Sequence, residues 1–525
     1  MGSASSVDRR DVGRCRSYLR ECLRIDTRAL AVFRIVAAVL ILADLFLRAR
    51  NFSYFYTDQG VVPRSLAMDA LPVEASVYFL TGSPVGTAAL FVLHGLIAVQ
   101  LLIGYRTRIA TALSLVFVLS LDLRNPLVLS YADTLFAWLL FWAIFLPLGE
   151  RWSVDAVHVD REPRQSVAGV ASALILGQMV TMYVVNGYHK SESELWTSGE
   201  AAALVLGLDD MTFLLADVVR SAPTLLEVGG LAWYYMLAFA WVLLLVRGRL
   251  RTALVAPFLF AHLSFAVTVR IGAFAFVAIA GLLLFLQAPF WDGLRGLLKR
   301  LGVPVAGVAT RLSRLQAVAT YFPQRQPVEG IVGRLSGNPR RTALAAGLAL
   351  FTVFALVAVL SAGGLVADDV DPAATAQQGA VGFVDHQTEW SIFAPTPRTT
   401  DRYYVFPART ESGERIDVYN ERPLTYDRPA AELQTQYETY RERFYMNSVR
   451  TGDPPATPER LAEHVCAEWN TDRDDELTHV NMYVVEEDVT RETIDDPADR
   501  DRDAFRIHRH GCGDREPTDI EPPTR

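Results

Sequence analysis

The sequence contains very little lysine. Of its 50 basic residues only Lys190 and Lys299 are lysines, and the others are arginines. Lys299 lies in a basic stretch where any cation would serve, whereas Lys190 ends a long apolar run. Arginine does not lose its proton in a protein, but a desolvated lysine can, and it can then act as a base. Lys190 is therefore a candidate for chemistry, although a GC-rich genome alone would also make lysine scarce.

Cysteine is scarce as well, and several familiar site motifs are absent. Cys15 and Cys22 lie in the N-terminal tail without a nearby histidine, which disfavours a metal site. Cys466 and Cys512 are the only cysteines of the C-terminal region, and we expect them to form a disulfide. The sequence has no P-loop, Gly-rich dinucleotide turn, His-Glu-x-x-His or Cys-x-x-Cys motif. It predicts no metal, and nothing in it supports nucleic-acid binding.

Long apolar runs, in contrast, are abundant before residue 364. The chain is 51% hydrophobic, and runs of about 20 apolar residues match the roughly 30 Å of hydrocarbon that a helix must cross. We predict a mostly α fold, a polytopic transmembrane helical bundle of about nine spans followed by a C-terminal exterior α+β domain. The predicted spans are 29–48, 85–103, 109–123, 131–148, 167–187, 229–246, 252–268, 271–289 and 343–363.

The placement of arginine predicts the orientation. With nine alternating spans, the arginine-rich tail and loops all fall on one side, which is the cytoplasmic side by the positive-inside rule. We therefore expect a multi-pass protein of the cell membrane, in contact with the lipid bilayer, with its N-terminus cytoplasmic and its C-terminal domain exterior. The predicted regions are a basic tail at 1–28, a transmembrane domain at 29–289, a basic amphipathic segment at 290–342, a last span at 343–363 and an acidic domain at 367–525.

The C-terminal region differs in composition and in pattern. It has no lysine, and its acidic residues outnumber its arginines, which suits a solvated acidic face in a salty exterior and leaves open a surface for a basic partner. Alternation predicts strands at 402–408 and 415–420, joined by a turn at Ser412-Gly413, and further strands at 479–485 and 505–508. Helices are expected at 429–446 and from Thr457-Pro458 onward. The stretch 201–219 predicts an interfacial helix on the outer surface.

Ionisable residues within the apolar runs are the first candidates for a site, because a charge in lipid is costly. In the predicted topology, Asp133, Lys190, His262 and Arg270 all fall at the outer end of the bundle. Their convergence would form a pocket that opens to the exterior. The alternative is that the cations reach toward the headgroups and that the buried histidine is satisfied within the bundle.

Five stretches carry a resemblance to a known family. They are 26–35, Trp152-Ser153-Val154-Asp155, Tyr183 to Trp196, His262 with Ile271-Gly272-Ala273-Phe274, and more weakly Trp390-Ser391-Ile392-Phe393. In order and spacing they resemble the HTTM group of membrane proteins, which is similar to the vitamin K-dependent γ-glutamyl carboxylase. Lys190 falls at the position of the carboxylase's catalytic lysine, and Trp196 at that of a following tryptophan.

The resemblance implies a set of roles for these positions. The catalytic candidates are Lys190 as the base, with His189, His262 and Asp133 in support. The substrate-binding candidates are Asn186, Tyr188, Trp196 and Arg270. The structural candidates are Arg34, Trp152, Asp155, Gly272 and Trp390. The implied cofactor is a reduced quinone of the menaquinone type, and the implied partner is an exported peptide or protein substrate.

The chain also departs from the carboxylase pattern. Where the carboxylase has Asn-His-Ser-Tyr, this sequence reads Tyr131-Ala132-Asp133-Thr134, and Phe265 replaces an asparagine three residues after His262. The resemblance therefore implies a quinol-oxidising enzyme that modifies an exported substrate, rather than a glutamate carboxylase. The alternative is a non-catalytic membrane protein that binds a secreted partner or assists its export.

Overall fold

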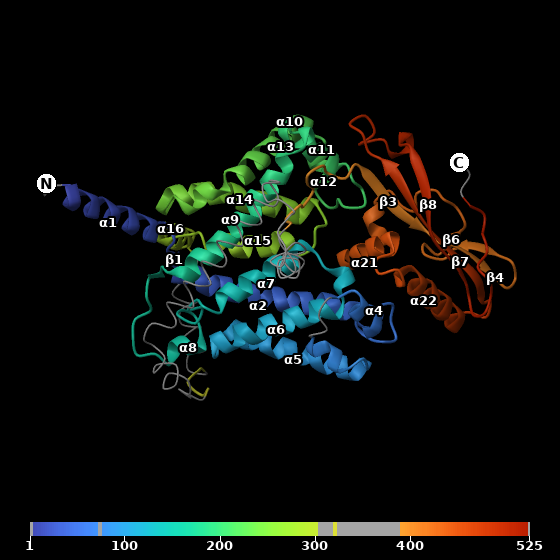
Figure 1. Cartoon of the computed structure of the whole chain (residues 1–525), viewed down its shortest axis with the longest axis horizontal. Coiled ribbons are helices and arrows are strands. Elements are labelled where there is room, and N and C mark those ends of the chain that lie inside the picture. The colour runs from blue at the N-terminus through green and yellow to red at the C-terminus, as the bar shows by residue number, and fades with distance from the viewer. Residues whose placement is uncertain (1–3, 72–75, 303–318, 323–388, 523–525) are drawn as a thin grey trace, which may run out of the picture.

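The computed structural model describes residues 4–71, 76–302, 319–322 and 389–522 of the 525-residue chain. A helical part, formed by the residues up to 302, lies beside a C-terminal part built on a β-sheet (Figure 1). The predicted span 343–363 and most of the segment 290–342 lie outside the described residues.

The helical part contains a helix at each of the first eight predicted spans. The longer helices are α1 (Ala4–Cys22), α2 (Thr27–Arg50), α5 (Pro84–Ile103), α6 (Thr107–Arg124), α7 (Tyr131–Ala143), α9 (Val170–Ser191), α13 (Pro223–Ala238), α14 (Gly248–Thr268), α15 (Phe274–Leu283) and α16 (Ala288–Arg300). The shorter elements are α3 (Phe52–Tyr56), α4 (Arg64–Asp69), η1 (Val77–Leu80), η2 (Pro126–Val128), α8 (Val154–Val157), α10 (Glu194–Ser198), α11 (Ala201–Leu206), α12 (Ala216–Arg220), η3 (Ala240–Leu244), and the paired strands β1 (Ile25–Asp26) and β2 (Ser166–Val167).

Four of these helices, α2, α5, α9 and α14, are long and apolar enough to cross a membrane. The pair α15 and α16, bent by 103°, raises the number to five among the described residues if it forms one span. The chain is therefore a membrane protein, with fewer clear spans than the nine expected. Part of the difference arises because α7 has 13 residues. Such a helix rises only about 20 Å, which is less than the roughly 30 Å of hydrocarbon that a spanning helix must cross.

Local sequence signals fix where these helices begin. Ser83 accepts a hydrogen bond from the backbone of α5, whose first residue is a proline, as expected at a helix N-terminus. Ser130 and Asp133 form a reciprocal capping box at the start of α7. Gly104, with φ of 69°, ends α5 in the left-handed conformation that glycine adopts without strain.

The predicted interfacial helix at 201–219 is wrong as a continuous element. The structure has α11 and α12 separated by a loop that contains the buried Asp209 and Asp210. Asp209 accepts from Arg220 at 2.8 Å and from Arg428 at 2.6 Å, and Asp210 pairs with Arg398. Buried carboxylates need such partners. The loop therefore places Asp209 and Asp210 against arginines of the C-terminal part, and the helix does not continue through it.

The C-terminal part is built around one long central strand. It contains β3 (Thr400–Val405), β4 (Pro407–Thr410), β5 (Arg415–Asp417), β6 (Arg422–Pro423), β7 (Leu477–Asp488) and β8 (Arg502–Gly511), with η4 (Leu433–Gln436), α21 (Tyr440–Thr451), α22 (Thr457–Asp472) and η5 (Pro497–Asp499). All strand pairs are antiparallel, in the order β3-β7-β4-β5-β6, and β8 also pairs with β7.

The hairpin at Ser412-Gly413 and the strands predicted at 479–485 and 505–508 are present. The strand predicted at 402–408 is wrong as one element, because the chain breaks at Phe406 into β3 and β4, both of which pair with β7, and the strand predicted at 415–420 ends at Asp417. The helix expected at 429–446 is wrong before Tyr440, because Thr439 caps α21 and only η4 precedes it. The helix from Thr457 is present, but Ala456 rather than Thr457 occupies its N-cap position.

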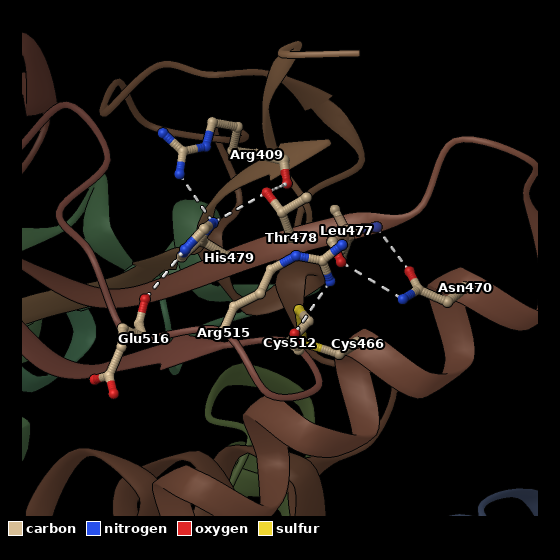
Figure 2. The surroundings of a disulfide bond; sticks show 9 residues. All are labelled: Arg409, Cys466, Asn470, Leu477, Thr478, His479, Cys512, Arg515 and Glu516. Atoms are coloured by element: carbon tan, nitrogen blue, oxygen red, sulfur yellow. Dashed lines mark hydrogen bonds between the residues drawn. A yellow bond between two sulfur atoms is a disulfide. The ribbon is translucent and has the colours of Figure 1, made fainter. Parts of the chain in front are cut away.

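A disulfide joins α22 to the sheet (Figure 2). Cys466 of α22 and Cys512, the residue after β8, have their sulfurs 2.04 Å apart. Beside them, Asn470 of α22 accepts a hydrogen bond of 2.7 Å from the backbone N–H of Leu477 in β7. The predicted cysteine pair is thus the pair that the structure joins.

Candidate functional site

The Lys190 amine lies at the last turn of α9, under a segment of the C-terminal part. Its Nζ donates to the carbonyl oxygens of Ile392 at 2.6 Å and Phe393 at 3.1 Å. The side chain is only 1% exposed, and Nζ lies 3.7 Å from the ring centroid of Trp196. The Trp196 indole donates to the same Phe393 carbonyl at 2.8 Å. Within the part of the chain that the structure describes, no carboxylate contacts this amine.

The segment 390–393 is held in place by further contacts. The Asn186 amide donates to the carbonyl oxygens of Trp390 at 2.6 Å and Ile392 at 3.1 Å. The Tyr131 hydroxyl lies 2.7 Å from the Ser391 hydroxyl. Trp390 is completely buried, with φ of 42°, a conformation that costs a non-glycine residue about 1–3 kcal/mol. These contacts maintain that strained backbone directly over Lys190.

A cavity of about 290 Å³ is lined in part by this segment, through Ser391 and Phe393, and by three arginines. The arginines are Arg398, Arg402 and Arg443. The first pairs with Asp210, and the second donates to Glu486 at 2.8 Å. Arg443 has a buried Nε without a hydrogen-bond partner, and burial lowers its pKa. The lining thus holds three arginines and one carboxylate, Asp210, and it shares Ser391 and Phe393 with the segment that covers the Lys190 amine.

His262 lies deeper in the helical part, in aromatic surroundings. Its Nε2 is 2.8 Å from the Tyr183 hydroxyl, and its Nδ1 is buried without a partner among the described residues. The rings of Trp233, Phe265 and Phe274 lie within 6 Å of it, centroid to centroid. Tyr183 and Lys190 are seven residues apart on α9, which is about two turns on one face. The pair Tyr183–His262 therefore lies roughly 10 Å further along α9 than the amine.

Asp133 belongs to a different site from Lys190. One of its carboxylate oxygens accepts from the backbone of Ser130 at 2.8 Å, and the other accepts from Arg441 at 2.9 Å and Arg48 at 3.3 Å. The structure thus does not bring Asp133 into contact with the predicted base.

Two arginines and three aspartates form this second site, which we call the charge cluster: Asp44, Arg48, Asp122, Asp133 and Arg441. Arg48 donates to Asp44 at 2.7 Å and to Asp122 at 2.6 Å, and Arg441 donates to Asp44 at 2.6 Å. Since Arg441 comes from α21, the cluster connects the C-terminal part to the helices. Sequence reasoning missed Arg48, Asp122 and Arg441, although Asp44 and Arg48 are spaced four residues apart in an apolar helix, which was an available signal.

The other predicted site residues are placed as follows. His189 lies 3.8 Å from the Glu192 carboxylate, and Tyr188 is 42% exposed with its ring against that of His189. Arg270 donates to backbone carbonyls of Gln434, Tyr437 at 3.1 Å and Glu438 at 3.3 Å. It therefore holds the loop before α21 instead of lining the Lys190 site.

The residues predicted to be structural make tight backbone contacts. Arg34 is buried and donates to the Trp152 carbonyl at 2.5 Å. Asp155 accepts from the backbone N–H groups of Arg106 and Thr107, each at 2.7 Å, at the start of α6. Gly272 has φ of 65°, and a Cβ there would lie 2.4 Å from the Tyr440 ring.

The family of the chain follows from comparison with known proteins. The model of the HTTM domain matches residues 23–291, which is more than half of the chain. The protein therefore belongs to the HTTM-domain family, as its sequence predicts. The resemblance to the carboxylase is a resemblance to this domain. The comparisons with curated proteins and with solved structures found no match.

Proposed function

We propose that this protein is a membrane enzyme of the carboxylase-like class in which Lys190 is the base. The observation that carries the proposal is a buried amine that no carboxylate among the described residues contacts. A neutral amine has two N–H groups, which match the two carbonyls, and one lone pair, which remains to accept a proton. The aromatic wall of Trp196 and the segment 390–393 keep water away from that lone pair.

The proposed cofactor is a reduced quinone of the menaquinone type. The residues near His262 suit such a ring, because Trp233, Phe265 and Phe274 supply aromatic faces and the unpartnered Nδ1 of His262 can bond a hydroxyl. When bound, the quinol supplies an acidic hydroxyl and reducing electrons. The chain's own contribution would be to hold one hydroxyl of the quinol at His262 and to accept the proton of the other hydroxyl, across the ring, at Lys190, which lies roughly 10 Å along α9.

The proposed substrate is an exported peptide or protein, with the N-terminus of the enzyme cytoplasmic and its C-terminal part exterior. The arginine-rich cavity that Ser391 and Phe393 help to line supports an approach from that part of the molecule. Glutamate carboxylation itself is not proposed, because the histidine of the carboxylase pattern is absent and Asp133 is bound within the charge cluster.

Oxygen uptake by the full-length protein in lipid, with reduced menaquinone, tests this function. We expect uptake in the wild type, loss in Lys190→Arg and Lys190→Ala, and no change in Lys299→Arg, the matched control at the only other lysine. Asn186→Leu loosens the segment 390–393 while keeping the amine, and it should lower uptake less than Lys190→Ala does. Wild-type protein without uptake, or Lys190→Arg with full uptake, would refute the proposal.

One observation favours a non-catalytic alternative. Lys190 and Asn186 both bind carbonyls of 390–393 and so fasten the C-terminal part to the helices. The protein would then bind a secreted partner or assist its export. In that case Lys190→Ala and Asn186→Leu should weaken the attachment equally, and no variant should change oxygen uptake.

A further inference from the structure

A second cavity, of about 210 Å³, lies between the end of α2, the start of α15 and the residues that open α21. Apolar side chains form much of its wall, among them Leu47, Phe213 and Phe276. Leu47 of α2 is 40% exposed and Phe276 of α15 is 47% exposed. Because α2 is long and apolar enough to span a membrane, exposed apolar side chains on these helices face lipid. The cavity thus has an apolar side at the edge of the bundle.

Within the described ranges of the chain, two arginines at this cavity form no ion pair with a carboxylate. Arg50, the last residue of α2, is exposed, and among the described residues its side chain has neither a hydrogen bond nor an ion pair. Arg270 donates to carbonyl groups of Gln434, Tyr437 and Glu438. Burial lowers the pKa of Arg270, the negative charge of Glu442 raises it, and the positive charge of Arg50 lowers it. The two cations are therefore close to each other, and Glu442 offsets only part of the charge of Arg270.

The remaining charges of the lining do not cancel this excess. Glu438 is the one carboxylate in the described lining, and its Oε2 accepts from the Asn51 amide at 2.7 Å. Arg48 and Arg441 also line the cavity, but their charges are satisfied by the aspartates of the charge cluster. The open positive charge is therefore that of Arg50 and Arg270.

We propose that this cavity binds the phosphate headgroup of an anionic phospholipid from the leaflet next to the C-terminal part. The phosphate lies between Arg50 and Arg270, because guanidinium groups bind phosphate through charge-assisted hydrogen bonds. The first carbons of an acyl chain lie along Leu47 and Phe276. A free anion would gain nothing from those apolar side chains, whereas basic pockets between membrane helices are typical sites for anionic headgroups.

The bound lipid has a structural consequence. The cavity wall includes Glu438, Thr439 and Tyr440, which lead into α21, together with α2 and α15 of the helical part. A headgroup in this position contacts both parts at once. A ligand that binds only when the two parts are in contact stabilises that contact by mass action. The lipid therefore strengthens the attachment of the C-terminal part.

Native mass spectrometry of the full-length protein, with phosphatidylglycerol or phosphatidylcholine added, tests the proposal. We expect preferential retention of phosphatidylglycerol, with affinity about tenfold lower in Arg50→Gln, the loss of one charge-assisted bond. Arg50 is exposed, so this variant should fold. Arg460→Gln, at an exposed arginine of α22 paired with Glu463, is the matched control and should bind as the wild type does.

Thermal unfolding separates the lipid from a free anion. Phosphatidylglycerol should raise the unfolding temperature of the wild type more than that of Arg50→Gln, while inorganic phosphate at the same concentration should not. Equal retention of the two lipids, unchanged affinity in Arg50→Gln, or an equal temperature rise with inorganic phosphate would each overturn the assignment.

Discussion

Replacing Arg441 by glutamine should weaken the attachment of the C-terminal part to the helices. Arg441 is 4% exposed, and its guanidinium donates to Asp44 at 2.6 Å, to Asp133 at 2.9 Å and to the Val128 carbonyl at 3.1 Å. The substitution removes one of the two cations in the charge cluster. Three aspartates then share Arg48 alone, in a site that water hardly reaches.

The expected magnitude follows from burial. Breaking a buried ion pair by removing one partner costs about 3–5 kcal/mol, because the other charge stays buried and uncompensated. An exposed pair contributes about 0–1 kcal/mol. Arg460, whose exposed guanidinium lies 2.7 Å from Glu463 on α22, is therefore the matched control, and Arg460→Gln should change stability by less than about 1 kcal/mol.

The free energy of unfolding can be measured by titrating the protein in mixed micelles with a denaturing detergent. A double variant, Arg441→Gln with Asp133→Asn, removes one of the stranded charges and should be more stable than the sum of the single changes predicts, by at least about 1 kcal/mol. A loss in Arg441→Gln no larger than in Arg460→Gln, or strict additivity with Asp133→Asn, would refute the reasoning.

Two further predictions concern pH and the accessibility of the amine. Burial raises the pKa of Glu442 from 4.5 to about 7, and the negative charge of Glu438 also raises it. The Glu442 carboxyl therefore holds its proton more tightly in the folded protein than in the unfolded chain. Stability should fall by up to about 3 kcal/mol as pH rises from about 4.5 to about 7, and thermal unfolding of Glu442→Gln should lack that component. An amine-reactive label should modify the exposed Lys299 quickly and the buried Lys190 slowly. Labelling of Lys190, followed by peptide mass spectrometry, should accelerate in Asn186→Leu, and an unchanged rate would contradict the role of Asn186 as a fastener.

Local features of the fold could be predicted from the sequence. The turn at Ser412-Gly413 needs a positive φ, which Gly413 adopts at 89°, and alternation on both sides specifies the strands. Cys466 and Cys512 were the only cysteines of their region and could pair only with each other inside it. The helix from Thr457 carries its proline at the first turn. Each of these signals lies within a few residues of its effect, or leaves one possible partner.

Which residues come together at each site could not be predicted in the same way. The acceptors of the Lys190 amine lie about two hundred residues away, at Ile392 and Phe393, and they are backbone oxygens that any sequence would supply. Arg441 is one of many arginines in its region, and nothing nearby in the sequence distinguishes it. In the sequence, Asp133 lies beside the position of the carboxylase's histidine. In the folded protein, however, its carboxylate pairs with Arg48 and Arg441. Partner choice over such distances is decided by packing, which a single sequence does not display.

Two of the attachments of the C-terminal part, at Lys190 and at Arg441, differ in what it costs to release them. Moving Ile392 and Phe393 away from Lys190 breaks four hydrogen bonds, two from Lys190, one from Asn186 and one from Trp196, at about 0.5–1.5 kcal/mol each. It also relieves Phe393, whose φ of 52° costs about 1–3 kcal/mol in the bound form. The relief of strain therefore offsets part of the cost of the broken hydrogen bonds.

Arg441 has no such compensation, because its release strands buried carboxylates at about 3–5 kcal/mol. A base at Lys190 is therefore uncovered by a local movement of 392–393, while Arg441 keeps the C-terminal part in place. The labelling rate of Lys190 distinguishes local opening from departure of the whole C-terminal part. Faster labelling in Asn186→Leu, with the two parts still joined, indicates local opening. Faster labelling only in Arg441→Gln indicates that the whole C-terminal part must leave. For the proposed base, the local route would reconcile a dry, covered amine with repeated access by the proposed substrate.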